Sequence, residues 1–297
     1  MADVPSHEPV LLAETVALLD PSRGGLFVDC TVGLGGHARA VLQAGASRLL
    51  GLDRDPSALA LAAAALAEWS PRVELVHADY RDLGVVLDAR SEAAVDGVLA
   101  DLGVSSLQFD TEGRGFSFRR DEPLDMRMDQ TTGPTVADLL TSVDEEELAN
   151  VIFQFGEERF SRRIARGVVE ARRLAPVATT GQLAQIVRRA VPRRGYQRID
   201  PATRTFQALR IWVNHELDGL DAFLVSASRR LRAGARLAVI TFHSLEDRIV
   251  KHTFRALAAG GDALRVLTRK PLSPGEAEVA RNPRARSAKL RAIERLA

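Results

Sequence analysis

The sequence has little cysteine, few aromatic residues and no long apolar run, and these shortages narrow what the protein can be. Cys30 is the one cysteine in 297 residues, so an internal disulfide is excluded, and we expect a small core residue in a reducing compartment. No apolar run reaches the ~18 residues of a membrane span. The N-terminus carries acids where a secretory leader would be basic and then apolar. The composition predicts a cytoplasmic globular protein with no membrane partner.

Histidine is also scarce, and its spacing argues against a metal centre. The six histidines include no HxxxH pair, which would place two ligands on one helix face, and there is no second cysteine. We therefore expect no bound metal.

Arginine, in contrast, is abundant and unevenly placed, although the formal net charge is only +1. Residues 157–210 hold 13 arginines against four acids, and residues 281–297 hold six basic residues against one acid. Such patches are expected where a protein meets a phosphate backbone. The alternative is a solvated helix face in a chain that uses arginine in place of lysine.

The most informative segment reads DCTVGLGGHA, near the N-terminus. An apolar run over residues 25–30 predicts a buried parallel strand, and a loop with Gly33, Gly35 and Gly36 follows before a helix. The next apolar run ends in Asp53. This order is typical of a nucleotide-binding βαβ unit, in which the carboxylate accepts hydrogen bonds from ribose hydroxyls.

The glycine loop favours a cofactor without phosphate. Its GxGG pattern differs from the GxGxxG of dinucleotide loops, and it holds no basic residue to meet a pyrophosphate. Glycine still allows the backbone to approach a ligand closely. S-adenosylmethionine therefore fits better than NAD, and a purely structural glycine turn is a third interpretation.

Two further apolar runs, at residues 73–77 and 95–100, predict strands that lead to Tyr80 and Asp101. Ligands of open α/β sheets lie outside the carboxyl ends of the strands, so these side chains are expected on one rim beside Asp53. Asp101 offers only acceptors and could bind the N–H hydrogens of a target amine. The alternative is that it caps a turn.

A later strand, over residues 236–242, leads to His243 on the same rim. Histidine is a base near neutral pH and could take the proton that an amine loses on methylation. The alternative is a hydrogen-bonded histidine that shapes the loop. Asp121 and Asp125, on either side of Pro123, are interpreted equally well as turn residues.

The pattern changes in the middle of the chain. Residues 107–129 are polar and predict a long ordered loop, whereas residues 135–190 have a helical period and no strand signal. Helix is expected to resume at Pro201 and to continue, in one or two pieces, to Gly234.

Strands are then expected at residues 236–242, 264–268 and 288–293, so the sheet resumes after the helical block. The sequence thus predicts an α/β fold with an inserted all-helical domain. The expected boundaries are 1–110 for the first part of the core, 111–205 for the loop and insert, and 206–297 for the second part with a basic C-terminal tail.

Nine sequence blocks together resemble the bacterial RsmH (MraW) family. They are, in order, HEPVLL, DCTVGLGGHA, GLDRDP, ADLGVSS, RGFSF, PLDMRMD, TRTFQALRIWVNHEL, TFHSLEDRIVK and NPRARSAKLR. The resemblance implies a class I (Rossmann-like) methyltransferase fold with a helical insertion and S-adenosylmethionine as methyl donor. It also implies N4-methylation of a specific cytidine in the decoding region of 16S rRNA, within the small ribosomal subunit.

The resemblance carries cofactor contacts onto Gly35, Gly36, His37, Asp53, Tyr80, Asp101 and Gln108. Tyr80 stands where the family often has phenylalanine, and an aromatic ring there can still stack on adenine. The serine that follows the histidine in the family's loop is Ala38 here, which removes none of these contacts.

Asp101 and His243 are the expected catalytic residues, and the basic insert and tail are expected to hold RNA phosphates. The oligomeric state is left open, a homodimer included. Two alternatives also stay open. One is a methyltransferase that acts on DNA, protein or a small molecule, and the other is a non-catalytic ribosome-assembly factor.

Overall fold

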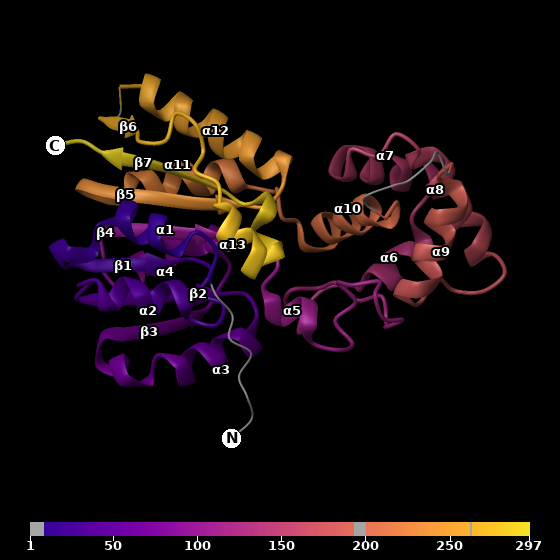
Figure 1. Ribbon diagram of the computed structural model, residues 1–297, viewed down its shortest axis with the longest axis horizontal. Helices are drawn as coiled ribbons and strands as arrows, with labels where there is room; N and C mark the ends of the chain where they lie inside the picture. Colours follow the sequence, from indigo (N-terminus) through magenta and orange to yellow (C-terminus); the bar gives the residue numbers. More distant parts are fainter. Residues whose placement is uncertain (1–8, 193–199, 262) are drawn as a thin grey trace. The chain divides into compact units, whose positions relative to one another are not determined.

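The computed structural model describes residues 9–192, 200–261 and 263–297. These residues divide into two compact units (Figure 1). The sheet unit comprises the described residues up to Gly103 and from Gly219 onward, and the helical unit is Val104–Asp218. His7 of the first sequence block and Arg193, Arg194 and Arg198 of the basic segment lie outside the described residues.

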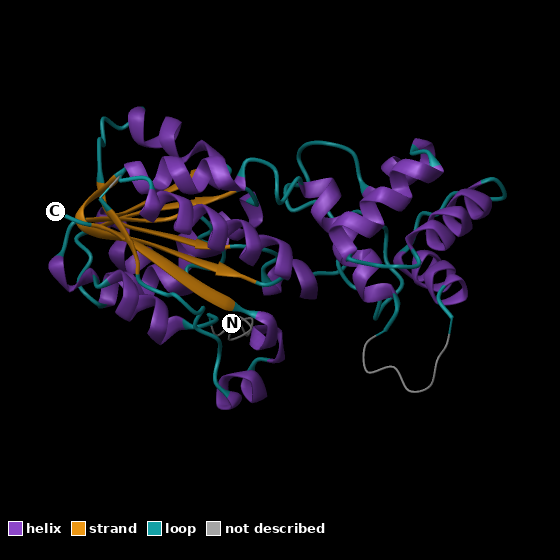
Figure 2. Cartoon of the chain, turned by 90° about the horizontal axis from the view of Figure 1, so that it is seen from above, coloured by secondary structure: helices purple, strands orange, loops and turns teal. Residues whose placement is uncertain are grey.

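The sheet unit is built on a seven-stranded sheet in the order β3-β2-β1-β4-β5-β7-β6. Its strands are drawn in orange in Figure 2. Strands β1 to β5 pair in parallel, and β7 runs antiparallel to both β5 and β6. The strands are β1 (Leu26–Asp29), β2 (Arg48–Asp53), β3 (Val73–His77), β4 (Val95–Asp101), β5 (Leu231–Thr241), β6 (Leu264–Val266) and β7 (Lys289–Arg295). The strand order reverses between β1 and β4, which is where ligands of doubly wound sheets bind.

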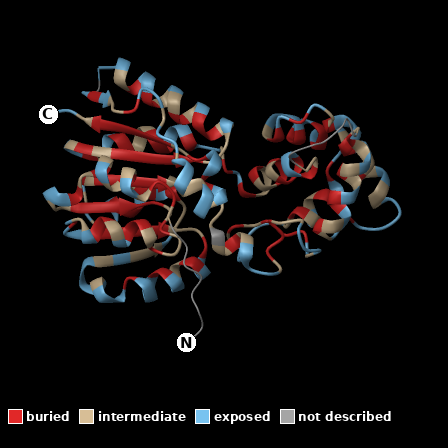
Figure 3. Ribbon diagram, viewed as in Figure 1, coloured by how far each residue is buried: buried red, intermediate tan, exposed pale blue. Residues whose placement is uncertain are grey.

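Helices cover both faces of the sheet, as a parallel sheet requires. One apolar cluster joins the sheet to α1 (Leu12–Leu19), α2 (Gly36–Gln43) and α3 (Pro56–Ala65). The other joins it to α4 (Leu83–Asp88), α11 (Leu220–Arg229) and α12 (Ser244–Ala259). The short elements are α13 (Glu276–Arg281) and the 3₁₀ turns η1 (Pro21–Arg23), η2 (Ala67–Arg72), η3 (Tyr80–Asp82) and η4 (Pro283–Ser287). Buried positions line the strands and the inner sides of these helices (Figure 3).

The helical unit has a core of its own, formed where its helices pack together. Its helices are α5 (Ser106–Asp110), α6 (Val136–Ser142), α7 (Glu145–Gly156), α8 (Ser161–Arg172), α9 (Thr180–Ala190) and α10 (Ala202–Asn214). Gly156 lets α7 and α10 approach closely, because a Cβ there would lie 2.6 Å from the carbonyl oxygen of Arg204. Within the described residues no helix is both long and apolar enough to cross a membrane.

The structure confirms the expected α/β class, with a Rossmann-like sheet interrupted by helices, and it differs from the sequence prediction at three places. The compact units change at Gly103 and Gly219, whereas the sequence placed the boundaries at 111 and 206, because α10 packs into the helical unit. The predicted loop 107–129 begins within α5. Strand β5 starts at Leu231, within the stretch predicted to be helical up to Gly234.

Candidate active site

The glycine loop lies between β1 and α2, at the carboxyl edge of the sheet. Gly33 and Gly35 adopt left-handed conformations with φ of 52° and 81°, and Gly35 is the N-cap of α2. A Cβ on Gly36 would lie 2.4 Å from Cγ of Pro9, so only glycine fits there without a shift. On Gly33 the nearest atom to such a Cβ would be 3.8 Å away, so its open side is free for a ligand.

Asp53 ties this loop to the end of β2. Its Oδ2 accepts a hydrogen bond of 2.8 Å from the backbone N–H of Gly33, and its Oδ1 accepts one of 2.9 Å from Asp55. Each carboxylate oxygen has two lone pairs, so capacity is left for two further donors. Asp55 caps α3 through Ser57, at 3.0 Å, which confirms its expected cap role, and the ligand role of Asp53 stays a prediction.

Three buried or partly buried carboxylates gather at this rim, those of Asp29, Asp53 and Asp101. Burial, aided by the Asp53 carboxylate, raises the pKa of Asp29 to about 7 against the hydrogen bonds from Thr31. Burial also raises the pKa of Asp53, more than its backbone hydrogen bonds lower it. The pKa of Asp101 is raised well above its ordinary value by burial and then by the carboxylates of Asp29 and Glu246. The rim therefore favours a positively charged ligand.

Asp101 is held by its backbone and leaves part of its carboxylate uncommitted. Its backbone N–H donates to Oγ1 of Thr31 at 2.6 Å, and its Oδ2 lies 3.6 Å from Nδ1 of His37. Its Oδ1 is buried and has no hydrogen-bond partner among the residues that the structure describes. A buried acceptor of this kind is costly unless a ligand supplies a donor.

His37 stands on the first turn of α2, with Nε2 3.0 Å from the carbonyl oxygen of Val10. Because a carbonyl oxygen only accepts, Nε2 carries the proton. The ring therefore links the segment before α1 to the loop and to Asp101.

Tyr80 begins η3 shortly after the end of β3 at His77, and Asp79 caps the turn through Arg81 at 3.0 Å. Its ring meets Phe223 edge-on, with centroids 4.8 Å apart and planes at 63°. The Arg81 guanidinium lies 5.6 Å from the ring centroid. These contacts fix the plane of the ring at the rim, and its contact with adenine stays a prediction.

His243 lies at the end of β5 as expected, but its ring is already engaged in a helix cap. It is the N-cap of α12, and its Nδ1 accepts the N–H of Glu246 at 3.4 Å. In return Glu246 accepts the N–H of His243 at 3.3 Å and that of Phe242 at 2.9 Å. Nε2 of His243 is buried, 3.2 Å from Oε1 of Glu246. This arrangement favours the second interpretation of His243, a histidine that shapes the loop.

Gln108 belongs to the helical unit, and its contact with the cofactor stays a prediction. It forms a capping box with Ser105 at the start of α5, with bonds of 3.1 and 3.3 Å. Two aspartates of the same unit are used structurally, as the turn interpretation predicts: Asp121 accepts the N–H of Gly181 at 2.8 Å, and Asp125 binds Arg127 at 2.7 Å.

Sequence reasoning missed two buried acids near the rim, Glu246 and Asp247 on α12. Asp247 binds Arg291 at 2.6 Å and Lys289 at 3.1 Å, so two residues of the predicted basic tail are committed within the sheet unit. The spacing of a capping box, with glutamate three residues after His243, was the signal that could have found Glu246.

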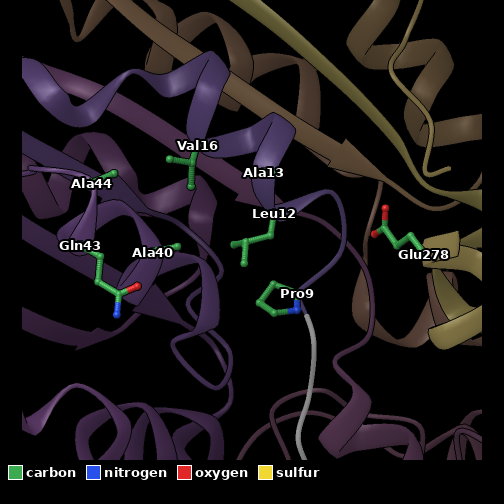
Figure 4. A pocket seen from close by; sticks show the side chains of 8 residues that line it. All are labelled: Pro9, Leu12, Ala13, Val16, Ala40, Gln43, Ala44 and Glu278. Carbon is green, nitrogen blue, oxygen red and sulfur yellow. The ribbon is translucent and has the colours of Figure 1, made fainter.

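A separate groove lies outside this rim (Figure 4). It has a volume of about 530 Å³ and is formed by residues of α1, α2 and α13 with the segment before α1. Its lining is Pro9, Leu12, Ala13, Val16, Ala40, Gln43, Ala44 and Glu278, which includes no predicted site residue.

The sequence was also compared with known families. Residues 5–296 match the model of the MraW methylase family, which is almost the whole chain. The chain belongs to the MraW methylase family.

Individual relatives agree with this membership. The chain is 51% identical to "Ribosomal RNA small subunit methyltransferase H" of Nitrobacter winogradskyi, over 97% of this chain and 90% of that protein. It is 47% identical to the protein of that name from Geotalea uraniireducens, over 98% of each chain. Among solved structures, a putative methyltransferase from Streptococcus mutans in complex with SAH is similar, with a TM-score of 0.43 and 12% identity over 98% of this chain and 100% of that one.

Proposed function

We propose that this MraW-family chain transfers a methyl group from S-adenosylmethionine to the N4 amino group of a specific cytidine in the decoding region of 16S rRNA. The small ribosomal subunit would be its partner, and the cytoplasm, where subunits assemble, its location. The observation that carries the proposal is the acidic rim around Asp101, with a buried carboxylate oxygen that lacks a donor. The names of the relatives support the RNA substrate.

The residues of the rim fit the cofactor by their chemistry. Asp53 has acceptor capacity for two ribose hydroxyls, and the loop at Gly33 is open to close approach. Burial raises the pKa values of Asp29 and Asp101, and a cationic ligand beside them would favour their ionised forms. When bound, S-adenosylmethionine supplies a methyl group on a positively charged sulfur.

Asp101 is the residue that we assign to the target amine. The amine of cytosine is a poor nucleophile because its lone pair is delocalised into the ring. A hydrogen bond from an amine N–H to the carboxylate favours a tetrahedral nitrogen whose lone pair can attack. Alignment of this kind can contribute on the order of 7 kcal/mol to lowering the barrier. The proton is then released late, to solvent, because Nδ1 of His243 caps α12 and its Nε2 is buried.

The helical unit is proposed to hold RNA around the target base, which must be unstacked to react. Arg162 and Arg163 on α8 are exposed, as are Arg173 and Arg189. Other arginines of this segment are committed within the unit: Arg172 donates to two carbonyl oxygens, and Arg188, Arg204 and Arg210 pair with acids. The exposed set is the one available to phosphates.

The proposal is tested by transfer of tritium from labelled S-adenosylmethionine. We expect label in small subunits from a strain that lacks the enzyme, and N4-methylcytidine in their nucleosides by mass spectrometry. Label in DNA or protein instead would show that one of these, and not rRNA, is the substrate. Cofactor binding without any transfer would favour the assembly factor.

Asp101→Ala should abolish transfer while the protein stays folded, and Asp101→Asn should reduce kcat/KM about 100-fold, because a preorganised charged acceptor is lost. Asp88→Asn, at a side chain 62% exposed on α4, is the matched control and should transfer methyl groups normally. Wild-type turnover by Asp101→Ala would remove Asp101 from the mechanism.

A further inference from the structure

Phe242 is an aromatic residue at the rim that the function described so far does not use. It follows the last residue of β5 and is only partly buried. Aromatic rings at the carboxyl edge of a parallel sheet lie where ligands bind.

The register of β4 and β5 places Phe242 on the same face as Asp101. Asp101 pairs with Ile240, and side chains alternate along a strand. Leu99 and Ile240 both belong to the apolar cluster on the side of α1 to α3, so Asp101 and Phe242, each two residues further on, lie on that side too. The contact of Asp101 with His37 on α2 and the packing of Phe242 against the same cluster agree with this.

The ring lies next to the chain that leaves β4. The N–H of Leu102 donates to the carbonyl of Ile240 at 3.0 Å, which brings Gly103 opposite Phe242. A Cβ on Gly103 would lie 3.5 Å from Cδ2 of the ring. The ring therefore lies beside residues 101–103, a segment that begins with Asp101, the proposed acceptor for the target amine.

Glu246 fixes the backbone that carries this ring. It is 1% exposed, and its carboxylate accepts the N–H groups of Phe242 and His243 at 2.9 and 3.3 Å. The buried pair of Asp247 with Arg291 anchors the next residue of α12 to β7. A ring held in this way is preorganised, so little freedom is lost when a ligand packs against it.

We propose that Phe242 is the residue on which the target base stacks, with Glu246 as its positioning residue. The proposal rests on the proposed function, since it names how that site holds an unpaired base. Unpaired bases in RNA are recognised by stacking on aromatic side chains, and every base offers a π face. The stack places the exocyclic amine of cytosine toward the neighbouring carboxylate of Asp101.

The test compares large apolar and aromatic side chains with and without a π face. Phe242→Leu keeps apolar contact with the core, whereas Phe242→Tyr and Phe242→Trp keep an aromatic ring. Each is assayed for tritium transfer to small subunits from a strain that lacks the enzyme, and for binding of S-adenosylhomocysteine by calorimetry. We expect Phe242→Leu to lower kcat/KM about 10- to 100-fold, mainly through KM, because one base–aromatic stack is lost. The tyrosine and tryptophan variants should stay within about 3-fold of wild type, and the Kd of S-adenosylhomocysteine should not change.

Two results would overturn the stacking role. One is a kcat/KM of Phe242→Leu that falls less than about 10-fold. The other is an equal loss in the leucine, tyrosine and tryptophan variants, since that shows a core-packing residue. If the wild-type protein itself transfers no label to small subunits, the proposed function has failed, and this result is distinguishable from both.

Discussion

Replacing Asp29 by asparagine should change how the stability of the sheet unit depends on pH. Asp29 is 3% exposed at the end of β1, and burial raises the pKa of its carboxyl from 3.8 to about 7. Between these two pH values the folded protein binds a proton that the unfolded chain has released. Stability therefore falls as the pH rises through this interval, and the whole penalty is present above it.

The magnitude follows from the same interval. One pH unit corresponds to ~1.4 kcal/mol, so the wild-type protein should lose ~3 kcal/mol between pH 5 and pH 8 through Asp29. Asparagine keeps an oxygen that can accept the N–H of Thr31, now 3.1 Å from Oδ1 of Asp29. The cost of burying its amide is the same at every pH. That cost cancels when the variant's gain at pH 5 is subtracted from its gain at pH 8.

The assay is urea unfolding at pH 5, 6.5 and 8 without cofactor. The chain has two tryptophans, Trp69 in the sheet unit and Trp212 in the helical unit. In a Trp212→Phe background the fluorescence of Trp69 reports on the sheet unit alone. We expect the change in the free energy of unfolding caused by Asp29→Asn to be ~3 kcal/mol more favourable at pH 8 than at pH 5.

Asp221→Asn is the control, because this side chain is exposed in the first turn of α11. It should cost less than ~1 kcal/mol, at both pH values alike. An effect of Asp29→Asn that is equal at pH 5 and pH 8 would refute the reasoning, since it would mean that Asp29 ionises normally in the fold.

Two further predictions concern the rim of β5 and the helical unit. Glu246→Ala leaves the N–H groups of Phe242 and His243 without their acceptor and should lower the free energy of unfolding by ~2–3 kcal/mol. Glu246→Gln keeps one acceptor oxygen and should lower it by less. Equal losses for the two variants in urea unfolding would count against the capping role. Binding to small subunits should weaken steeply with salt, and replacing both Arg162 and Arg163 by glutamine should reduce the slope of log K against log salt by about 2. An unchanged slope in filter-binding titrations would exclude these arginines as phosphate contacts.

Much of the sheet could be predicted, because its strands are continuous apolar runs that end in polar residues. The bounds of β2 and β3 match the apolar runs that end at Asp53 and His77. The start of β5 could not be found in this way. From Leu231 to Gly234 apolar and polar residues alternate only weakly, and this segment directly follows α11. The hydrophobic period of the sequence therefore gives no signal where helix changes to strand.

The candidate site shows a similar limit. The position of His243 on the rim follows from the strand order, but its hydrogen bonds do not, because they depend on how the turn into α12 folds back. Glu246 and Asp247 were missed because charged residues are rarely buried, and the burial of Asp247 depends on Arg291, a partner distant in the sequence.

The carboxylates of the rim also bear on the choice of cofactor that the glycine loop leaves open. NAD would bring two negative phosphates toward Asp29, Asp53 and Asp101, whose pKa values are already raised by burial. S-adenosylmethionine brings no phosphate, and its sulfonium and ammonium groups outnumber its one carboxylate. A pair of unit charges ~5 Å apart at an effective dielectric constant of ~20 interacts by ~3 kcal/mol, so the sign of the ligand's charge outweighs small differences in the loop. Because burial raises the pKa of all three acids, the protein loses stability as the pH rises and they ionise, and a cationic ligand offsets this loss by favouring the ionised forms.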